Sequence, residues 1–229
     1  MKRLDPVTED DTKKGPVFVV DDEPAIRDSL RIMLTARGYL VHTFDSGASF
    51  LRTSAGVDRG CLLVDMMMPD MTGLELQSEL AVHGIDIPVC FITGHADVPK
   101  AVQAMKAGAI DFVQKPYTND QLVESIEHAL AVSSERRSRA REEADASDAL
   151  ATLTDREYDV LAELMAGNPN KVAAANIGIS PRTVEKHRAR IMEKLGAHSL
   201  SQVIQIAMTA GVDGRGQHHR HQMIDSRPV

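Results

Sequence analysis

The stretch CLLVDMMMPDMTGLEL at residues 61–76 decides the fold of this chain. Its apolar start predicts a buried strand, Asp65 closes that strand, a turn-rich loop follows, and a helical pattern begins near residue 73. A strand that passes through a loop into a helix is the repeating unit of parallel α/β sheets. Open sheets of this kind bind ligands at the carboxyl ends of their strands, so Asp65 lies at an expected binding edge.

The same unit recurs on both sides of this stretch. Further apolar runs predict strands at 17–20, 40–44, 87–92 and 110–113. Helical patterns lie near 24–37, 46–54, 73–83, 97–107 and 118–132. We therefore expect an α/β fold in which helices cover both faces of a five-stranded parallel sheet.

Composition divides the chain into regions. Residues 133–151 are charged and almost free of large apolar side chains, which predicts a helical linker without a core face. Every pattern from residue 152 onward is helical. The expected organisation is a disordered arm at 1–15, an α/β domain at 16–132, the linker at 133–151, a small all-α domain at 152–212 and a disordered tail at 213–229.

The net charge of −7 is unevenly distributed. Residues 1–132 hold 12 Lys and Arg against 20 Asp and Glu, giving −8, whereas residues 152–212 hold 7 against 6, giving +1. The overall acidity argues against non-specific coating of nucleic acid. It still allows a local basic surface in the second domain.

The remaining composition predicts a cytoplasmic protein. The chain has no apolar run of about 18 residues, so we expect no membrane span. Its first residues lack the apolar segment of a secretory signal. Cys61 and Cys90 both fall in predicted buried strands, and we expect them to be reduced packing residues.

Polar residues follow the other predicted strands as well. Asp21 and Asp22 come directly after the first strand, Thr93 after the fourth, and Lys115 after the fifth. Three carboxylates at one sheet edge would hold a hard divalent cation, for which Mg²⁺ is the expected ion. A hydroxyl and an ammonium beside them suit an incoming phosphoryl group. The set predicts that Asp65 is phosphorylated and that the protein is a switch.

Each of these residues also has a plainer interpretation. A single Asp at a strand end is most often a helix N-cap, and a single Lys is most often a solvated charge. Their joint occurrence on successive strand ends favours a site. The rival enzyme is a phosphatase with an Asp nucleophile, which needs a second carboxylate two residues on as a general acid. The chain has Met67 there, so we expect no enzymatic turnover.

The first domain resembles the receiver domain of a two-component response regulator. The resemblance rests on DDEP, LLVDMMMPDMTGLEL and FITGHADVPKAVQAMKAGAIDFVQKPY. It implies a flavodoxin-like fold with Asp65 as the phosphoacceptor. It also implies Thr93 and Phe112 as the switch pair and Lys115 as the lysine of the site, although Phe112 alone would be a core residue. The Mg²⁺ ligands that it implies are Asp21, Asp22, Asp65 and the backbone carbonyl of Met67.

The second domain contains SPRTVEKHRARIMEKLG at 180–196. Its apolar residues Val184, Ile191 and Leu195 form one stripe, and residues 181–194 carry five basic and two acidic side chains, a net +3. A short helix, a tight turn and this basic helix predict a helix-turn-helix, whose second helix enters the major groove of DNA. A solvated amphipathic helix is the plainer alternative.

This domain resembles the LuxR/NarL-type DNA-binding domain along nearly its whole length. The chain as a whole resembles the FixJ branch, through its SPRTVE and HRA segments and its ITGH and DVP segments. For His187 the resemblance allows two roles, a contact with a DNA phosphate or a contact that caps the core. The expected DNA contacts are Lys171, Arg182, Thr183, Glu185, Lys186, Arg188, Ala189 and Arg190.

These resemblances imply a transcription regulator controlled by phosphorylation. Its expected partners are a sensor histidine kinase, double-stranded promoter DNA, a second copy of the chain after phosphorylation, and RNA polymerase. The alternative from another class is a phosphorylation-dependent regulator that binds protein or RNA. His218, His219 and His221 in the tail could hold a metal, although disorder is the simpler interpretation.

Overall fold

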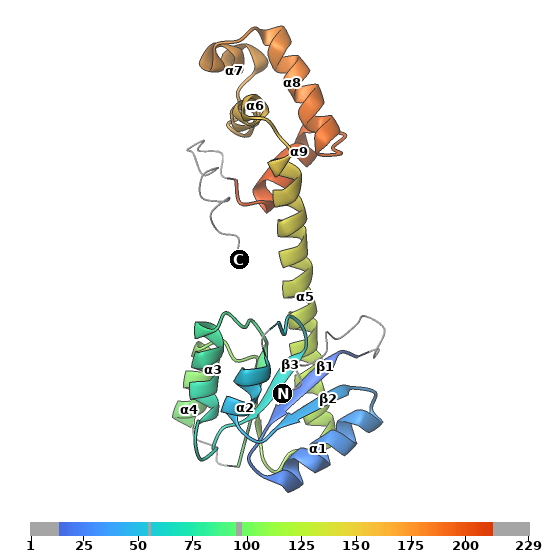
Figure 1. Cartoon of the computed structure of the whole chain (residues 1–229), viewed down its shortest axis with the longest axis vertical. Coiled ribbons are helices and arrows are strands. Elements are labelled where there is room, and N and C mark those ends of the chain that lie inside the picture. The colour runs from blue at the N-terminus through green and yellow to red at the C-terminus, as the bar shows by residue number, and fades with distance from the viewer. Residues whose placement is uncertain (1–13, 55, 95–97, 213–229) are drawn as a thin grey trace. The chain divides into compact units, whose positions relative to one another are not determined.

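Across residues 14–54, 56–94 and 98–212, which the computed structural model describes, five strands form one parallel sheet in the order β2-β1-β3-β4-β5 (Figure 1). The strands are β1 (Pro16–Val20), β2 (Leu40–Phe44), β3 (Cys61–Asp65), β4 (Val89–Thr93) and β5 (Asp111–Gln114). The helices between them are α1 (Pro24–Ala36), α2 (Gly47–Thr53), α3 (Gly73–Val82) and α4 (Val98–Lys106), and α5 (Asn119–Ala151) follows the last strand. The predicted α/β class is confirmed.

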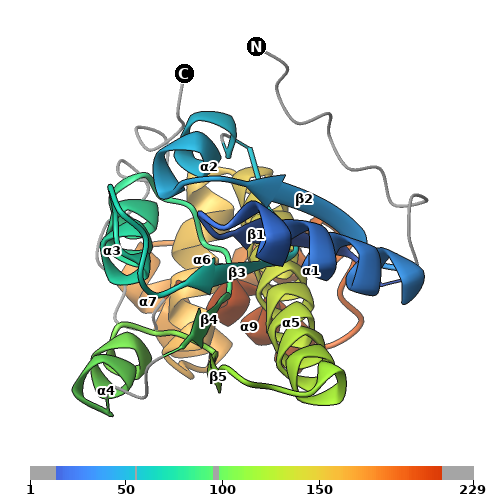
Figure 2. The same cartoon turned by 90° about the horizontal axis from the view of Figure 1, so that it is seen from below.

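The sheet is covered on both faces, because its central strands are apolar on both sides. One core joins Phe18, Leu62 and Phe91 to side chains of α2, α3 and α4. The other joins alternate strand residues, among them Val19 and Leu63, to α1 and α5. Figure 2 looks at these layers from below. Strands buried on both faces appear in the sequence as continuous apolar runs, which is why the runs predicted them.

Both cysteines lie in the core between the sheet and helices α1 and α5. Cys61 begins β3 and Cys90 lies in β4, and both are buried and free. Burial raises the pKa of Cys90 to about 12. The prediction that both cysteines are buried packing residues is confirmed.

The first residues of the predicted linker pack against the first domain. Helix α5 continues without a break from Asn119 to Ala151. The Ser133 hydroxyl, 7% exposed, accepts a hydrogen bond from the Gly60 backbone N–H at 3.1 Å. Arg136 pairs with Asp86, and Arg137 Nε lies 3.7 Å from Asp58 Oδ2. Polar contacts that periodicity does not reveal therefore hold this end of the helix to strand-start loops.

The far end of the same segment packs as well. Ala146 and Leu150 are buried, and Leu150 joins the apolar core of the second domain. A helix with small or polar residues on most faces can still bury one or two side chains where a neighbour covers them. This burial corrects the prediction that the segment has no core face.

The second domain is all-helical, as predicted. Its helices are α6 (Asp155–Met165), α7 (Asn170–Ile177), α8 (Pro181–Lys194) and α9 (Leu200–Thr209). Thr154 and Glu157 form a capping box at the start of α6. Val184 and Ile191 of α8 are fully buried, and Leu195 beyond its end is 8% exposed. The apolar stripe therefore faces the core and leaves the basic face of α8 outward.

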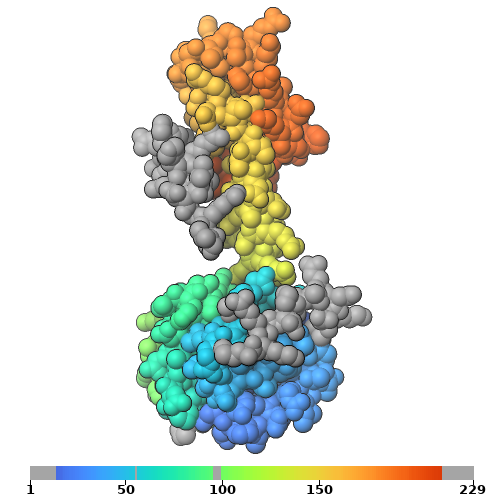
Figure 3. All heavy atoms as spheres, in the orientation of Figure 1, coloured from blue at the N-terminus to red at the C-terminus, as the bar shows by residue number. Residues whose placement is uncertain are grey.

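The described chain divides into two compact units, the first ending at Ser138 (Figure 3). No helix among the described residues is long and apolar enough to cross a membrane. The arm at 1–13 and the tail at 213–229, with its three histidines, lie outside the described residues. Lys14, at the end of the predicted arm, pairs with Glu127 at 3.0 Å.

Candidate functional site

An acidic pocket lies at the carboxyl ends of β1, β3 and β5. Lys115 Nζ is 2.9 Å from Asp65 Oδ1 and 3.4 Å from Asp21 Oδ2. Asp21 is 2% exposed and Asp65 is 8% exposed, so both carboxylates are almost fully withdrawn from water. The structure thus brings together three side chains that the sequence placed on separate strand ends.

Strand register explains this convergence. Val20 pairs with Val64 across β1 and β3, so the residues that follow each of them emerge side by side. Thr93 pairs with Gln114 across β4 and β5, and the Lys115 backbone N–H donates to the Thr93 carbonyl at 2.7 Å. The Lys115–Pro116 peptide bond is cis, in the sharp turn that follows β5.

Burial and charge act against each other in the pocket. Burial raises the pKa of Asp21 above its ordinary value. The hydrogen bond from the Glu23 backbone N–H and the charge of Lys115 lower this pKa, but they offset the effect of burial only in part. Burial alone would lower the pKa of Lys115, but its hydrogen bond to Asp65 and the charges of Asp65 and Asp21 raise it overall. One ammonium therefore balances two buried carboxylates, which leaves the pocket suited to a further cation.

The carboxylates of the pocket fit Mg²⁺, although they do not converge as three ligands on one point, as the sequence predicts. Asp22 is half-buried, and no group of three Asp, Glu, His or Cys side chains converges as a metal site in the described residues. Instead, Lys115 Nζ engages Asp21 and Asp65 directly. Two carboxylates are still sufficient, because Mg²⁺ commonly takes one or two and completes its shell with water.

The loop after β3 is built closely around Asp65. The Met67 backbone N–H donates to Asp65 Oδ2 at 2.7 Å. A Cβ on Gly73 would come within 2.8 Å of the Asp65 carbonyl oxygen, so only glycine allows α3 to begin this near the site. The Met67 side chain is 54% exposed, and its sulfur lies 3.5 Å from Lys100 Nζ. The Met67 side chain therefore lies on the solvent side of this loop, against Lys100.

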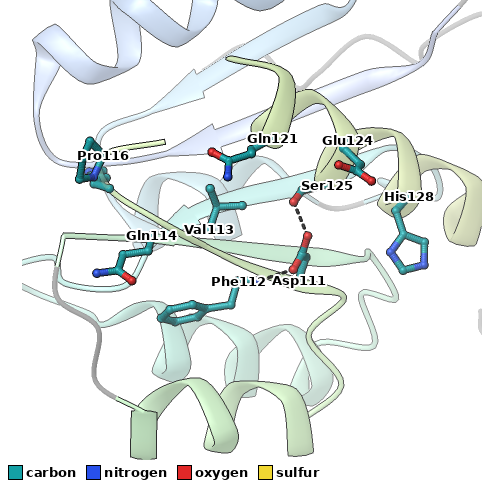
Figure 4. Close-up of a pocket in the computed structure, with 10 residues that line it drawn as sticks. Asp111, Phe112, Val113, Gln114, Pro116, Gln121, Glu124, Ser125 and His128 are labelled. Carbon is teal, nitrogen blue, oxygen red and sulfur yellow. Dashed lines mark hydrogen bonds between the residues drawn. The ribbon is translucent and has the colours of Figure 1, made fainter. Parts of the chain in front are cut away.

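The two predicted switch residues lie on the neighbouring strands β4 and β5. Thr93 ends β4 and is 2% exposed. Phe112 is half-buried and packs against the α3–α4 side of the core, whereas its neighbour Val113 belongs to the α5 side. Figure 4 shows these two side chains on opposite sides of β5, with Asp111 directed toward Ser125. A cavity of about 700 Å³ beside β5 and α5 also contacts Lys115 and Phe112. His95, near Thr93, lies outside the described residues.

The basic helix α8 presents most of the predicted DNA contacts to solvent. The exposed ones are Arg182, Glu185, Lys186, Ala189 and Arg190, and Lys171 is exposed at the start of α7. Thr183 is half-buried, and its hydroxyl shares a hydrogen bond with the Ser180 hydroxyl at 2.8 Å. Six of the eight predicted residues are therefore accessible, and Thr183 takes part in capping.

Arg188 has a role that the sequence did not predict. It is half-buried, and its Nη1 donates to Asn170 Oδ1 at 2.6 Å, joining α8 to α7. Glu157 caps the start of α6, and it also accepts a hydrogen bond from Lys194 Nζ at 2.7 Å, which ties α8 to α6. Both pairs join distant polar residues, and no local spacing in the sequence identifies them. His187 is half-buried and its Nδ1 has no hydrogen-bond partner.

The fold and these two surfaces define a class of protein, the response regulators with a DNA-binding output. Residues 17–127 match the family of response regulator receiver domains, and residues 151–207 match the luxR family of bacterial regulatory proteins. The chain belongs to these families and is a transcription regulator of the FixJ type.

Individual relatives cover most of the chain. The transcriptional regulatory protein FixJ of Rhizobium meliloti (strain 1021) is 46% identical over 85% of this chain and 96% of its own length. FixJ of Bradyrhizobium diazoefficiens is 41% identical over 88% of this chain and 98% of its own length. The solved structure of the response regulator StyR has a TM-score of 0.76 and 40% identity, covering 85% of this chain and 98% of its own.

Proposed function

We propose that Asp65 accepts a phosphoryl group from a sensor histidine kinase, and that this modification controls dimerisation and promoter binding. The observation that carries the proposal is the shared contact of Lys115 with Asp65 and Asp21 in a buried pocket. A buried carboxylate with an ammonium on one oxygen and a backbone N–H on the other is held in one orientation.

In the transfer, a carboxylate oxygen of Asp65 attacks the phosphorus atom of a phosphohistidine on the kinase. The phosphorus–nitrogen bond breaks, and its electron pair returns to the imidazole. Lys115 places positive charge beside the phosphoryl oxygens. We propose that Asp21, Asp22, Asp65 and the Met67 carbonyl hold Mg²⁺, which when bound neutralises charge on the transferred group. Met67 stands where a hydrolase would carry a second acid, so we propose no turnover of a free substrate.

The acyl phosphate would then change the surface formed by α4, β5 and α5. Thr93 would contact a phosphoryl oxygen, and Phe112, which is half-buried against the α3–α4 side of the core, would turn inward. Val102 and Met105 of α4 are 47% and 48% exposed, one turn apart. Apolar side chains on an outer helix face support a self-association surface here. In the second unit, Met208 of α9, 66% exposed, would add a contact between copies.

A dimer would present two copies of α8 to two half-sites about one helical turn of DNA apart. Arg182, Lys186 and Arg190 would neutralise phosphates or contact base edges, because all three are exposed on this helix. A regulator of promoters works where chromosomal DNA is, so we place it in the cytoplasm, with RNA polymerase as a further partner and no membrane attachment.

The test uses the full chain with and without Mg²⁺ and beryllium fluoride, which mimics a phosphoryl group on an aspartate. Light scattering would give its mass, and titration of duplex DNA selected by the activated protein would give its affinity. The proposal predicts a monomer that becomes a dimer and binds DNA more tightly. An unchanged mass and affinity would contradict it. Binding to RNA or protein with no preference for duplex DNA would favour the alternative class of regulator.

A further inference from the structure

Helix α8 carries a carboxylate in the middle of its outward side. Val184 and Ile191 face the core of the second unit and are fully buried. On the opposite side, four exposed residues follow the spacing i, i+3, i+4 and i+7, and they are Arg182, Glu185, Lys186 and Ala189. We call these four residues the outward face of α8. A partner that docks on this face meets one acidic side chain among basic ones.

The Glu185 carboxylate has no hydrogen bond or ion pair to any other residue in the described part of the chain. Arg182 and Arg188 lie three residues away on either side, which is the usual spacing of a helical ion pair. Arg188 is committed elsewhere, because its Nη1 donates to Asn170 Oδ1 at 2.6 Å. The Glu185 oxygens are therefore free to accept hydrogen bonds from a partner.

The inference that follows rests on the proposed binding of α8 to duplex DNA. In a helix-turn-helix, the N-terminal residues of the second helix meet base edges in the major groove. Glu185 lies in this part, because α8 begins at Pro181. DNA phosphates are anions without a donor, so a carboxylate is repelled by them. The donors in the major groove are the exocyclic amines of cytosine and adenine, which leaves these two bases as partners for Glu185.

The edges of these two bases differ beside the amine. Adenine N6 lies next to N7, which is an acceptor, whereas cytosine N4 lies next to a carbon-bound hydrogen. An ionised carboxylate has acceptors only, so adenine N7 repels its second oxygen and cytosine does not. Guanine and thymine present acceptors without an amine in this groove. The chemistry of a free carboxylate therefore favours cytosine over the other three bases.

We propose that Glu185 determines specificity by accepting a hydrogen bond from the N4 amine of a cytosine in each half-site. The charges of Arg182 and Lys186, on the same face, offset the repulsion between the carboxylate and the DNA backbone. Ala189, one turn further along, has only a methyl group, so no long side chain holds this face away from the bases. Glu185 thus lowers affinity for DNA in general and restores it at one base pair, which is how a repulsive element gives specificity.

Selection from a random duplex library tests this proposal with the full chain, Mg²⁺ and beryllium fluoride. We expect one position in each half-site at which cytosine is selected, and any other base there should weaken binding by at least about five-fold. Glu185→Gln should change the preference at this position to adenine, because an amide accepts from N6 and donates to N7. Glu193→Gln removes the same charge from an exposed residue near the other end of α8 and should keep the preference for cytosine.

A base analogue isolates the contact itself. A duplex that carries 2-pyrimidinone in place of the selected cytosine lacks only the N4 amine. The wild-type chain should bind this duplex at least about five-fold more weakly than the unmodified one. Glu185→Ala should bind the two duplexes with equal affinity. Its retained selection at the other positions of the site shows that this variant is folded.

Three results would overturn the proposal. The first is an identical base preference in the wild type and both Glu185 variants. The second is a gain in affinity of Glu185→Gln for every sequence with no change in preference, which would mean that the carboxylate acts only through its charge. In both of these cases the proposed function stands, because duplex DNA is still selected. The third is a wild-type chain that selects no duplex sequence, and this result would contradict the proposed function as well.

Discussion

Lys115 Nζ lies 2.9 Å from Asp65 Oδ1, although their strands are not neighbours. β4 lies between β3 and β5 in the sheet, so the lysine side chain reaches across the end of an intervening strand. The same ammonium lies 3.4 Å from Asp21 Oδ2 beyond β3. One cation thus joins the ends of three strands, and any group added to Asp65 must displace or share that contact.

Asp21→Asn should make the first unit more stable at neutral pH and weaken its Mg²⁺ binding. The raised pKa of Asp21 means that the folded state holds the proton more tightly than the unfolded state does. Below about pH 4 the Asp21 carboxyl is protonated in both states and does not destabilise the fold. As pH rises through its raised pKa, ionisation of the buried carboxyl lowers the free energy of unfolding. Hydrogen exchange of β3 amides across this range measures the difference, with half-buried Asp22→Asn as the control. If Asp21→Asn gains as much stability in acid as at neutral pH, ionisation of Asp21 is not the cause.

Met67→Asn should shorten the lifetime of the acyl phosphate on Asp65. Met67 follows Asp65 by two residues and its side chain is exposed, and a thioether cannot orient an attacking water as an amide can. Phosphoryl loss would be followed on the purified full chain at fixed Mg²⁺. Met208→Asn, an exposed methionine of the second unit, is the matched control. A lifetime equal to or longer than that of the wild type would exclude a shielding role for Met67.

Lys186→Ala and Arg188→Ala should weaken DNA binding in different ways. Lys186 is exposed near the start of α8, so its loss should relax base preference by about 1–3 kcal/mol of discrimination. Arg188→Ala should reduce binding to all sequences and lower the salt slope by about 1, if its guanidinium contacts phosphate. Titrations of matched and mismatched duplexes at several salt concentrations measure both effects.

Asn170→Ala separates the two roles of Arg188. It removes the 2.6 Å hydrogen bond between α7 and α8 but keeps the positive charge of Arg188. If Arg188 contacts phosphate, this variant should retain most of its salt slope. A salt slope and affinity that match those of Arg188→Ala would show that Arg188 acts only by holding the two helices together.

Glu157→Gln should destabilise the second unit by about 2 kcal/mol at pH 7, the usual contribution of hydrogen bonds to a charged group. The hydrogen bond from Lys194, and then that from the Thr154 backbone, lower the pKa of Glu157 from 4.5 to about 2. Because the pKa of Glu157 is lower in the folded state, the ionised carboxylate stabilises the fold at pH values above the unfolded-state pKa. The stability difference between Glu157→Gln and the wild type should therefore vanish as pH falls from 4.5 toward 2. Calorimetry of the full chain measures it.

The control for this prediction is the exposed pair Arg156–Asp159, whose side chains are 64% and 50% exposed. Asp159→Asn should change stability by no more than about 0.5 kcal/mol. A similar loss in both variants would show that overall charge, rather than the buried Glu157–Lys194 contact, governs the stability of this unit.

The sequence predicted those parts of the molecule that repeat locally. Apolar runs located β1 and β3 because both faces of these strands are buried, and Asp65 was identified because it ends such a run. The capping box at Thr154 has the same local character, because its partner Glu157 is three residues away. The identity of the pocket followed from strand ends, which parallel sheets bring to one edge.

Contacts between distant polar residues could not be predicted in this way. Ser133 looked like part of a solvated linker, because its partner is the Gly60 N–H, 73 residues earlier. The direct contacts of Lys115 with Asp21 and Asp65 depend on side-chain positions that strand patterns do not fix. The unsatisfied oxygen of Gln77 likewise depends on tertiary packing of α3 against the end of α4.

Mapping of the phosphorylated residue tests the central claim most directly. The full chain would be treated with acetyl phosphate and Mg²⁺, and the acyl phosphate located by peptide mass spectrometry after trapping with hydroxylamine. Asp65→Asn should lose the label, whereas Asp70→Asn, an exposed carboxylate on the same loop, should keep it. A label that persists at another aspartate with full yield in Asp65→Asn would contradict the assignment of Asp65 as the phosphoacceptor.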